Sequence, residues 1–200
     1  MTAIANFLAA HPAVINGRAR VLATAGRAEL VALFAACGFT QGAEIGVWAG
    51  NFSKVLCERV PGLHLRAVDP WKSYADYQER KNEQVRLDGA YQLAKAALAR
   101  FNCTIVRKTS DEAAAEVPDG SLDFVYIDAN HAREYVRRDL ELWTPKVRRG
   151  GIVAGHDYQF NPKPHIQVKV AVDAFARDHH IEPVYVLSAD KSPSWFWVVG

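Results

Sequence analysis

Two aspartates and two histidines follow two apolar, strand-like stretches in the second half of the chain. The stretch "LDFVYID" ends at Asp128, with His131 three residues later, and "GGIVAGHD" ends at His156 and Asp157. If these stretches are neighbouring parallel strands, both carboxylates lie at the same edge of the sheet. Carboxylate oxygens suit Mg²⁺, whereas a histidine ligand suits softer ions such as Mn²⁺, Fe²⁺ or Zn²⁺. The pattern predicts a metal site at Asp128 and Asp157, with His156 as a third ligand, a second base or a structural residue.

His131 is a candidate general base at the same site. A neutral hydroxyl group is a poor nucleophile until its proton is removed or a Lewis acid lowers its pKa. Imidazole has a reference pKa of about 6.5, close to working pH, so it can take such a proton. Two alternatives stay open: His131 acts without a metal, or it only contacts backbone at the start of a helix.

A glycine-containing loop in the first half of the chain predicts a small-molecule site. In "GAEIGVWAGNFSKVL", residues 42–56, a strand-like start runs through Gly46 and Gly50 into an amphipathic helical pattern. A pyrophosphate-binding loop needs a glycine where Trp48 stands, and a phosphate loop needs a Lys-Ser/Thr ending that is absent. Glu44 strengthens this exclusion, because a carboxylate would repel phosphate and could orient an ammonium group. The ligand expected here has a nucleoside but no bridging phosphate.

The residues after the next two strand-like stretches fit a nucleoside. Asp69 ends "LHLRAVD", where a carboxylate can accept hydrogen bonds from both ribose hydroxyls. Trp71 could offer a ring face to adenine. Ser110, which follows "CTIVRK", could meet an adenine edge or could simply cap the next helix.

Strand-like and helical patterns alternate from about residue 41 onwards, which predicts a three-layer α/β fold with a mostly parallel sheet. We expect one domain over 1–200, with a helical segment at 1–40 and a Rossmann-like core at 41–200. The stretch "PVYVLSADKSPSWFWVV" has no room for a helix between its strands and predicts an antiparallel C-terminal hairpin. Seven strands are expected: "AEIGV", "LHLRAVD", "CTIVRK", "LDFVYID", "GGIVAGHD", "PVYVLSA" and "WFWVV".

Composition argues against several classes of partner. The chain has 200 residues, 24 of them basic and 22 acidic, for a net charge of +2, which provides no electrostatic footprint for nucleic acid. No apolar run approaches the roughly 18 residues of a membrane span, and no signal-peptide pattern precedes Pro12. The three cysteines have neither zinc-site nor disulfide-framework spacing. We therefore expect a cytoplasmic protein with a small-molecule partner, in which the N-terminal helices could pack against a second copy.

These motifs together resemble the class I S-adenosylmethionine-dependent methyltransferases. "EIGVWAG" resembles their E-x-G-x-x-x-G motif, and Asp69 resembles their ribose-binding acid. The stretch at residues 121–158 closely resembles a bacterial subfamily that carries "D-x-V-x-I-D-x-x-H" and "G-G-x-x-x-G-H-D-Y". This subfamily includes O-methyltransferases of small molecules and sugar-bearing natural products. The resemblance covers roughly residues 40–175 and implies the same metal and base assignment for Asp128, Asp157 and His131.

The second motif departs from the metal-dependent relatives at one point. Those relatives place a Glu or Asn beside the second aspartate, whereas His156 and Tyr158 flank Asp157 here. Metal dependence is therefore open, and a metal-free transfer driven by His131 is the alternative.

The resulting prediction is an S-adenosylmethionine-dependent O-methyltransferase of a small or glycosylated metabolite, assisted by Mg²⁺ or another divalent metal. An NAD(P)-dependent oxidoreductase and a non-catalytic S-adenosylmethionine-binding domain are the alternatives. The acceptor pocket is expected between the N-terminal helices, residues 72–90 and residues 158–165. Catalysis is assigned to His131 and Asp128. The donor-binding residues predicted are Glu44, Gly46, Gly50, Asn51, Asp69, Trp71, Ser110 and Asp128.

Overall fold

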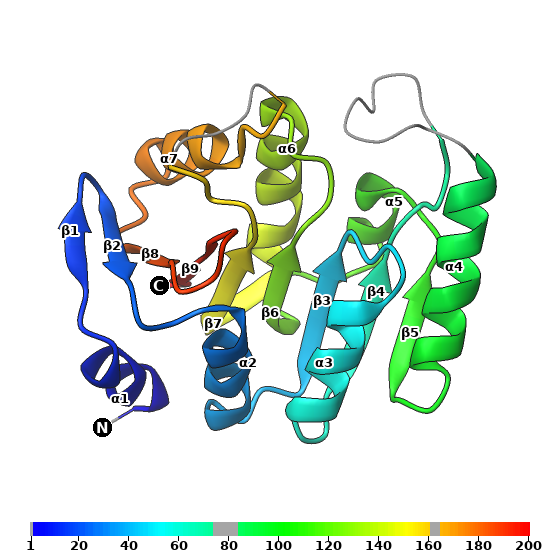
Figure 1. Cartoon of the computed structure of the whole chain (residues 1–200), viewed down its shortest axis with the longest axis horizontal. Coiled ribbons are helices and arrows are strands. Elements are labelled where there is room, and N and C mark those ends of the chain that lie inside the picture. Colours follow the sequence, from blue (N-terminus) through cyan, green and yellow to red (C-terminus); the bar gives the residue numbers. More distant parts are fainter. Residues whose placement is uncertain (1, 74–83, 161–164) are drawn as a thin grey trace.

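The computed structural model describes residues 2–73, 84–160 and 165–200. Within these residues, nine strands form one sheet in the order β1-β2-β8-β9-β7-β6-β3-β4-β5 (Figure 1). The strands are β1 (Val14–Asn16), β2 (Ala19–Leu22), β3 (Gln41–Ile45), β4 (His64–Val68), β5 (Cys103–Val106), β6 (Leu122–Ile127), β7 (Val147–Gly155), β8 (Val184–Leu187) and β9 (Ser194–Val198). The helices are α1 (Ala3–Ala10), α2 (Arg27–Ala36), α3 (Asn51–Arg59), α4 (Gln84–Leu98), α5 (Ser110–Ala114), α6 (Arg133–Trp143) and α7 (Val168–Asp178), with a 3₁₀ turn at Thr144–Lys146.

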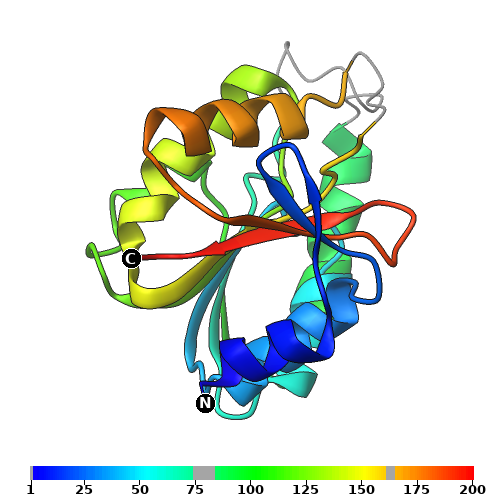
Figure 2. The ribbon, with the colours of Figure 1, turned by 90° about the vertical axis from the view of Figure 1, so that its left-hand side faces the viewer.

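The predicted α/β architecture is confirmed. All seven expected strands form, and β3 to β7 pair in parallel through β4-β5, β3-β4, β3-β6 and β6-β7. The last two strands form the predicted antiparallel hairpin, and β9 also pairs antiparallel with β7. Helices lie on both faces of the sheet, which gives three layers (Figure 2).

The N-terminal segment differs from its predicted all-helical state, and the sheet has nine strands rather than seven. Helices α1 and α2 form as expected, but β1 and β2 make an antiparallel hairpin between them, and β2 extends the sheet by pairing parallel with β8. The turn consists of Gly17 and Arg18, since Asn16 pairs with Ala19, and Gly17 adopts a positive φ of 60° at the first central position, as in a type II′ turn. The alternating pattern on each side of this turn was too short to stand out against its helical neighbours.

Each central strand is buried on both faces, which explains its nearly continuous apolar sequence. In β6, Phe124 and Tyr126 belong to the core beneath α1, α2 and α3. Val125 and Ile127 belong to the opposite core, beneath α5, α6 and α7. Because β3, β4, β6 and β7 run in the same direction, the loops that follow them meet along one edge of the sheet (Figure 1).

In the part of the chain that the structure describes, none of the helices has the length and apolar character needed to cross a lipid bilayer. Residues 74–83 and 161–164, which fall within two of the three segments expected to form the acceptor pocket, lie outside the described residues.

Candidate active site

The loop after β3 lies directly against the end of β6. Gly46 has a φ of +93°, and a Cβ atom at this position would lie 2.2 Å from the backbone oxygen of Asp128. The amide of Asp128 in turn donates to the carbonyl of Ile45 over 2.8 Å. Only glycine combines this backbone conformation with so close an approach. The predicted donor loop and the predicted metal-and-base site are therefore adjacent.

Asp69 holds the same loop from the end of β4. Its Oδ2 atom accepts the backbone N–H groups of Val47 and Trp48 over 3.1 and 2.9 Å, and its Oδ1 atom accepts that of Trp71 over 2.8 Å. Burial raises the pKa of this carboxyl, and the three backbone hydrogen bonds lower it, so that the net shift is upward. Asp69 thus shapes the loop, and its role toward a ribose stays a prediction.

Trp71, expected to offer a ring face to adenine, lies buried beneath the loop that follows β3. Its side chain is fully buried, the indole Nε1 donates to the carbonyl of Trp48 over 2.8 Å, and the ring packs 4.9 Å from that of Tyr91. The core beneath α4 surrounds the ring, and contact between Trp71 and adenine stays a prediction. The aromatic side chain stabilises the loop instead.

Glu44 lies in the interior, with 2% of its surface exposed. The hydroxyl of Ser53 on α3 donates a short hydrogen bond to its carboxyl group. Burial is the dominant cause that raises the pKa of Glu44 to about 8, so the group is mostly neutral at pH 7. The argument that a charged Glu44 repels phosphate is therefore corrected, while its place in a donor site stays untested.

Gly50 and Asn51 form the start of α3. Gly50 is the N-cap in the left-handed region, with a φ of 78°, and a Cβ there would lie 3.1 Å from Cα of Ala94 on α4. Asn51 is exposed at the first position of the helix. The second glycine thus allows α3 and α4 to approach each other, and donor contacts from either residue remain a prediction.

The side chain of Ser110, on α5, makes hydrogen bonds with two residues of α6. Its hydroxyl donates a short hydrogen bond to the buried Asp139 and accepts one from the indole Nε1 of Trp143 over 2.8 Å. Burial raises the pKa of Asp139 to about 7. The N-cap of α5 is Thr109, so the simple alternative that Ser110 caps the helix is wrong. Contact between Ser110 and adenine stays a prediction.

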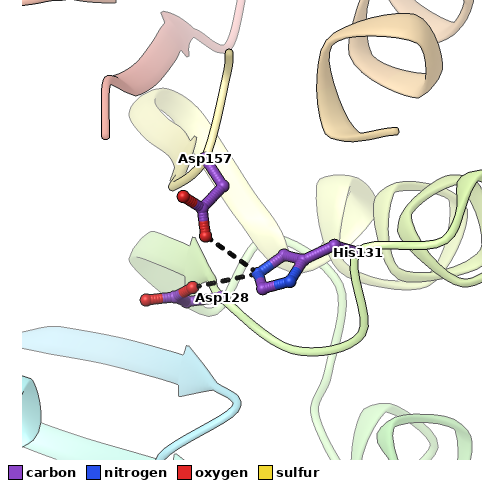
Figure 3. Close-up of side chains that lie close together, drawn as sticks. All are labelled: Asp128, His131 and Asp157. Carbon is purple, nitrogen blue, oxygen red and sulfur yellow. Dashed lines mark ion pairs between the residues drawn. The ribbon is translucent and has the colours of Figure 1, made fainter. Parts of the chain in front are cut away.

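Asp128, His131 and Asp157 converge at the ends of β6 and β7, as the parallel pairing of these strands predicts. The Nε2 atom of His131 lies 3.1 Å from Oδ2 of Asp157 and 3.5 Å from Oδ1 of Asp128 (Figure 3). The Nδ1 atom of His156 lies 3.4 and 3.7 Å from the same two oxygens. Asp157 has a φ of 56°, a strained conformation for a residue other than glycine and one that is often found at functional sites.

The electrostatics of the cluster favour charged carboxylates. Burial raises the pKa of Asp128, but hydrogen bonds from His131 and His156 and the charge of Arg27 outweigh burial and lower this pKa to about 2. The same two histidines hold the pKa of Asp157 well below its usual range despite burial. Burial lowers the pKa of His156, but the two carboxylates outweigh it and the net shift is upward. The cluster therefore combines two anions with two imidazoles at neutral pH.

The donor atoms fit a divalent cation. One ligand atom each from Asp128, His131 and Asp157 lie within 4.8 Å of one another. Two ionised carboxylates are the ligands that Mg²⁺ and Mn²⁺ prefer, and an imidazole suits Mn²⁺. His156 borders this group through its contacts with both carboxylates, and its role as a ligand stays a prediction.

Arg27, the first residue of α2, is a member of the site that the sequence did not indicate. One of its guanidinium nitrogens lies 3.2 Å from Oδ2 of Asp128, a residue 101 positions later in the chain. The guanidinium carbon lies 4.6 Å from the ring centroid of Phe52 and 5.5 Å from that of Tyr126. No motif marks this arginine, because only the packing of α2 on the sheet brings it to the cluster.

Solved structures with the same fold include several methyltransferases. The cofactor-bound protein Rv0187 from MTB has a TM-score of 0.63 and 15% identity over 98% of this chain and 89% of its own. A provisionally assigned caffeoyl-CoA O-methyltransferase from Staphylococcus aureus has a TM-score of 0.62 and 17% identity over 98% and 90%. A SAM-dependent methyltransferase from Aquifex aeolicus has a TM-score of 0.54 and 13% identity over 82% and 83%. At these identities the similarity shows the fold alone.

Sequence comparison identifies the family. The uncharacterized protein y4gI of Sinorhizobium fredii is 36% identical over 53 residues, which are 26% of this chain and 6% of that protein. The chain thus spans only a small part of this curated relative's length. The family model Methyltransf_24, described as a methyltransferase domain, matches residues 43–158. This match includes the loop after β3, Asp69 and the Asp128–His131–Asp157 cluster, and the chain therefore belongs to this methyltransferase family.

Proposed function

We propose that this protein transfers a methyl group from S-adenosylmethionine to a hydroxyl oxygen of a small or glycosylated acceptor, with a divalent cation assisting. The observation that carries the proposal is the position of the cluster. Asp128, His131 and Asp157 lie together at the edge of the sheet, and the loop at Gly46 contacts the backbone of Asp128. The family match supports methyl transfer over the alternative of an NAD(P)-dependent oxidoreductase.

The donor site is proposed along the loop after β3 and the ends of β4 and β5. When bound, S-adenosylmethionine supplies a methyl group activated by its sulfonium. Asp69 is proposed to accept hydrogen bonds from the ribose while it holds the amides of Val47 and Trp48. The Aquifex aeolicus protein of this fold is described as SAM-dependent, which supports the same donor here.

His131 is proposed to take the proton from the acceptor hydroxyl. Its Nε2 atom lies close to both carboxylates, so the positive charge that it gains would be stabilised by Asp157 and Asp128. The two aspartates would also hold the cation, which would lower the pKa of the acceptor hydroxyl. His131 and a bound cation would compete for the same carboxylate oxygens of Asp128 and Asp157. A transfer without metal, in which His131 alone removes the proton, is therefore the second form of this proposal.

The first test is calorimetric titration with S-adenosylhomocysteine, in EDTA and again with Mn²⁺ or Mg²⁺. The proposal expects micromolar binding of the nucleoside and a separate heat for the metal. Transfer of a labelled methyl group to a panel of phenols, catechols and glycosylated compounds then identifies the acceptor. Binding without transfer to any acceptor, and with no metal heat, would favour a non-catalytic donor-binding domain. No binding of S-adenosylhomocysteine would overturn the proposal.

A further inference from the structure

Arg27 brings a positive charge from the N-terminal segment into the anionic cluster. Its guanidinium contacts Oδ2 of Asp128, whereas Oδ1 of the same carboxylate faces His131 and His156. The two oxygens of Asp128 therefore have different partners. One belongs to the cluster with Asp157, and the other is held by an arginine that the family motifs do not include.

The arginine is fixed in this position from several sides. Its backbone N–H donates to Oδ2 of Asp190, in the turn between β8 and β9, over 2.6 Å. Its guanidinium lies over the rings of Phe52 and Tyr126, and 27% of its side chain is exposed. Cation–π contacts with these rings and the ion pair with Asp128 hold the charge near the cluster. Such a placement differs from that of a mobile surface arginine.

The positive charge of Arg27 would lower the affinity of the site for a divalent cation. Asp128 and Asp157 are the two anions of the candidate metal group, and Arg27 neutralises part of the charge of the first. A divalent cation would meet repulsion from the guanidinium as well as competition for Asp128. At a separation of about 6 Å, repulsion between one and two positive charges corresponds to about a tenfold change in affinity, even with the dielectric constant of water.

We propose that Arg27 sets the cation affinity of this site: it positions Asp128 through Oδ2 and weakens the binding of divalent cations by its charge. This inference rests on the metal-assisted form of the proposed function. Arg27 is a positioning residue here, since it acts through Asp128. If Arg27 served only to join α2 to β6, its replacement would change the stability of the fold but would not tighten cation binding.

The test is the affinity for Mn²⁺ alone, measured by calorimetry in the wild type, Arg27→Gln and Arg27→Lys. Arg27→Gln removes the charge and is expected to bind Mn²⁺ at least about tenfold more tightly. Arg27→Lys keeps the charge and is expected to stay within about threefold of the wild type, since the same Coulomb repulsion remains. Asp157→Asn serves as the control that locates the binding at this cluster.

Titration with S-adenosylhomocysteine and thermal denaturation show whether each variant keeps its fold. If Arg27→Gln does not fold, Arg27→Met takes its place as the uncharged variant. Methionine retains the apolar stem that packs on Phe52. Equal or weaker Mn²⁺ binding in the folded, uncharged variant would overturn the inference while leaving the metal site in place. Absence of Mn²⁺ binding in all variants would overturn both the inference and the metal part of the function. Methyl transfer is judged separately by donor binding and product formation.

Discussion

The carboxylate of Asp69 accepts the backbone N–H of Trp48 over 2.9 Å, across 21 positions of sequence. Trp48 has a φ of 52°, an uncommon conformation for a side chain of this size. The hydrogen bond therefore helps to hold a strained loop at the edge of the sheet where the donor is proposed to bind. Asp69 thus has one observed role and one proposed role: it supports the loop, and it is proposed to contact the ribose.

Replacement of Asp69 by alanine is expected to abolish binding of S-adenosylhomocysteine. The variant loses the acceptor for three backbone amides as well as the proposed partner of the ribose hydroxyls. Calorimetric titration measures the affinity, and Asp119→Ala, which removes a surface aspartate paired with Lys146, is the matched control. Unchanged affinity in Asp69→Ala would remove the ribose assignment.

His131→Ala is expected to bind S-adenosylhomocysteine as the wild type does but to lose at least about 100-fold in turnover. General-base catalysis contributes about 10²- to 10⁴-fold, and in the proposed reaction His131 takes the proton while the two aspartates hold the cation. The measurement is the rate of labelled methyl transfer to the acceptor that the panel identifies. His64→Ala is the control, because His64 begins β4 at the opposite edge of the sheet and contacts Thr104. Full activity of His131→Ala would exclude the base role.

Asp157→Asn is expected to remove the heat of Mn²⁺ binding and to leave donor binding unchanged. An amide retains the size of the carboxylate but lacks the charge that a divalent cation requires. Titrations with Mn²⁺ and with S-adenosylhomocysteine, run on the same preparation, separate the two effects. A metal heat of wild-type size in this variant would place the cation somewhere other than at this cluster.

Glu44→Gln is expected to flatten the dependence of stability on pH. The pKa of Glu44 is about 8 in the folded protein and 4.5 in its unperturbed state. Between these values the unfolded chain has lost its proton and the folded chain has kept it, so the free energy of unfolding falls as pH rises. The slope approaches about 1.4 kcal/mol per pH unit within this window and vanishes below and above it.

Denaturant unfolding of the wild type and Glu44→Gln at pH 5, 6.5 and 8 measures this difference. The variant is expected to gain stability relative to the wild type as pH rises. Glu58→Gln, at a surface glutamate paired with Arg100, is the control and should follow the wild-type profile. Parallel profiles for the wild type and Glu44→Gln would mean that Glu44 is ionised in the folded protein at neutral pH.

Gly46→Ala is expected to destabilise the protein by more than about 2 kcal/mol and to prevent donor binding. The new Cβ would overlap the backbone oxygen of Asp128, and that backbone belongs to a central strand end with little freedom to move. Gly120→Ala is the matched control: its φ is also positive, at 66°, but the position has open space around it. Gly120→Ala should lower the free energy of unfolding by about 1 kcal/mol, through backbone strain alone. Thermal denaturation compares the two, and equal losses would contradict the close approach.

The parallel pairing of the central strands and, on the condition that β6 and β7 are neighbours, the convergence of the cluster could be predicted from sequence. Strands buried on both faces have nearly continuous apolar sequences, and the intervening helices force parallel pairing. Parallel strands end at one edge, so Asp128 and Asp157 meet there once β6 and β7 are neighbours, as their pairing shows. His131 follows Asp128 closely enough to share that position. These are local or nearly local relationships, and sequence patterns record them directly.

Other features depend on contacts between distant segments, and only the tertiary structure decides them. Trp71 became a core residue because α4 covers it, and Glu44 takes its raised pKa from the interior that surrounds it. Arg27 meets Asp128 because α2 packs beside β6, across 101 positions. Burial and long-range pairing are properties of the assembled chain, and no short motif encodes them. The sequence by itself thus determined the scaffold and the cluster at the strand ends. The tertiary structure decided which groups surround the site residues and thereby set the charge of each residue.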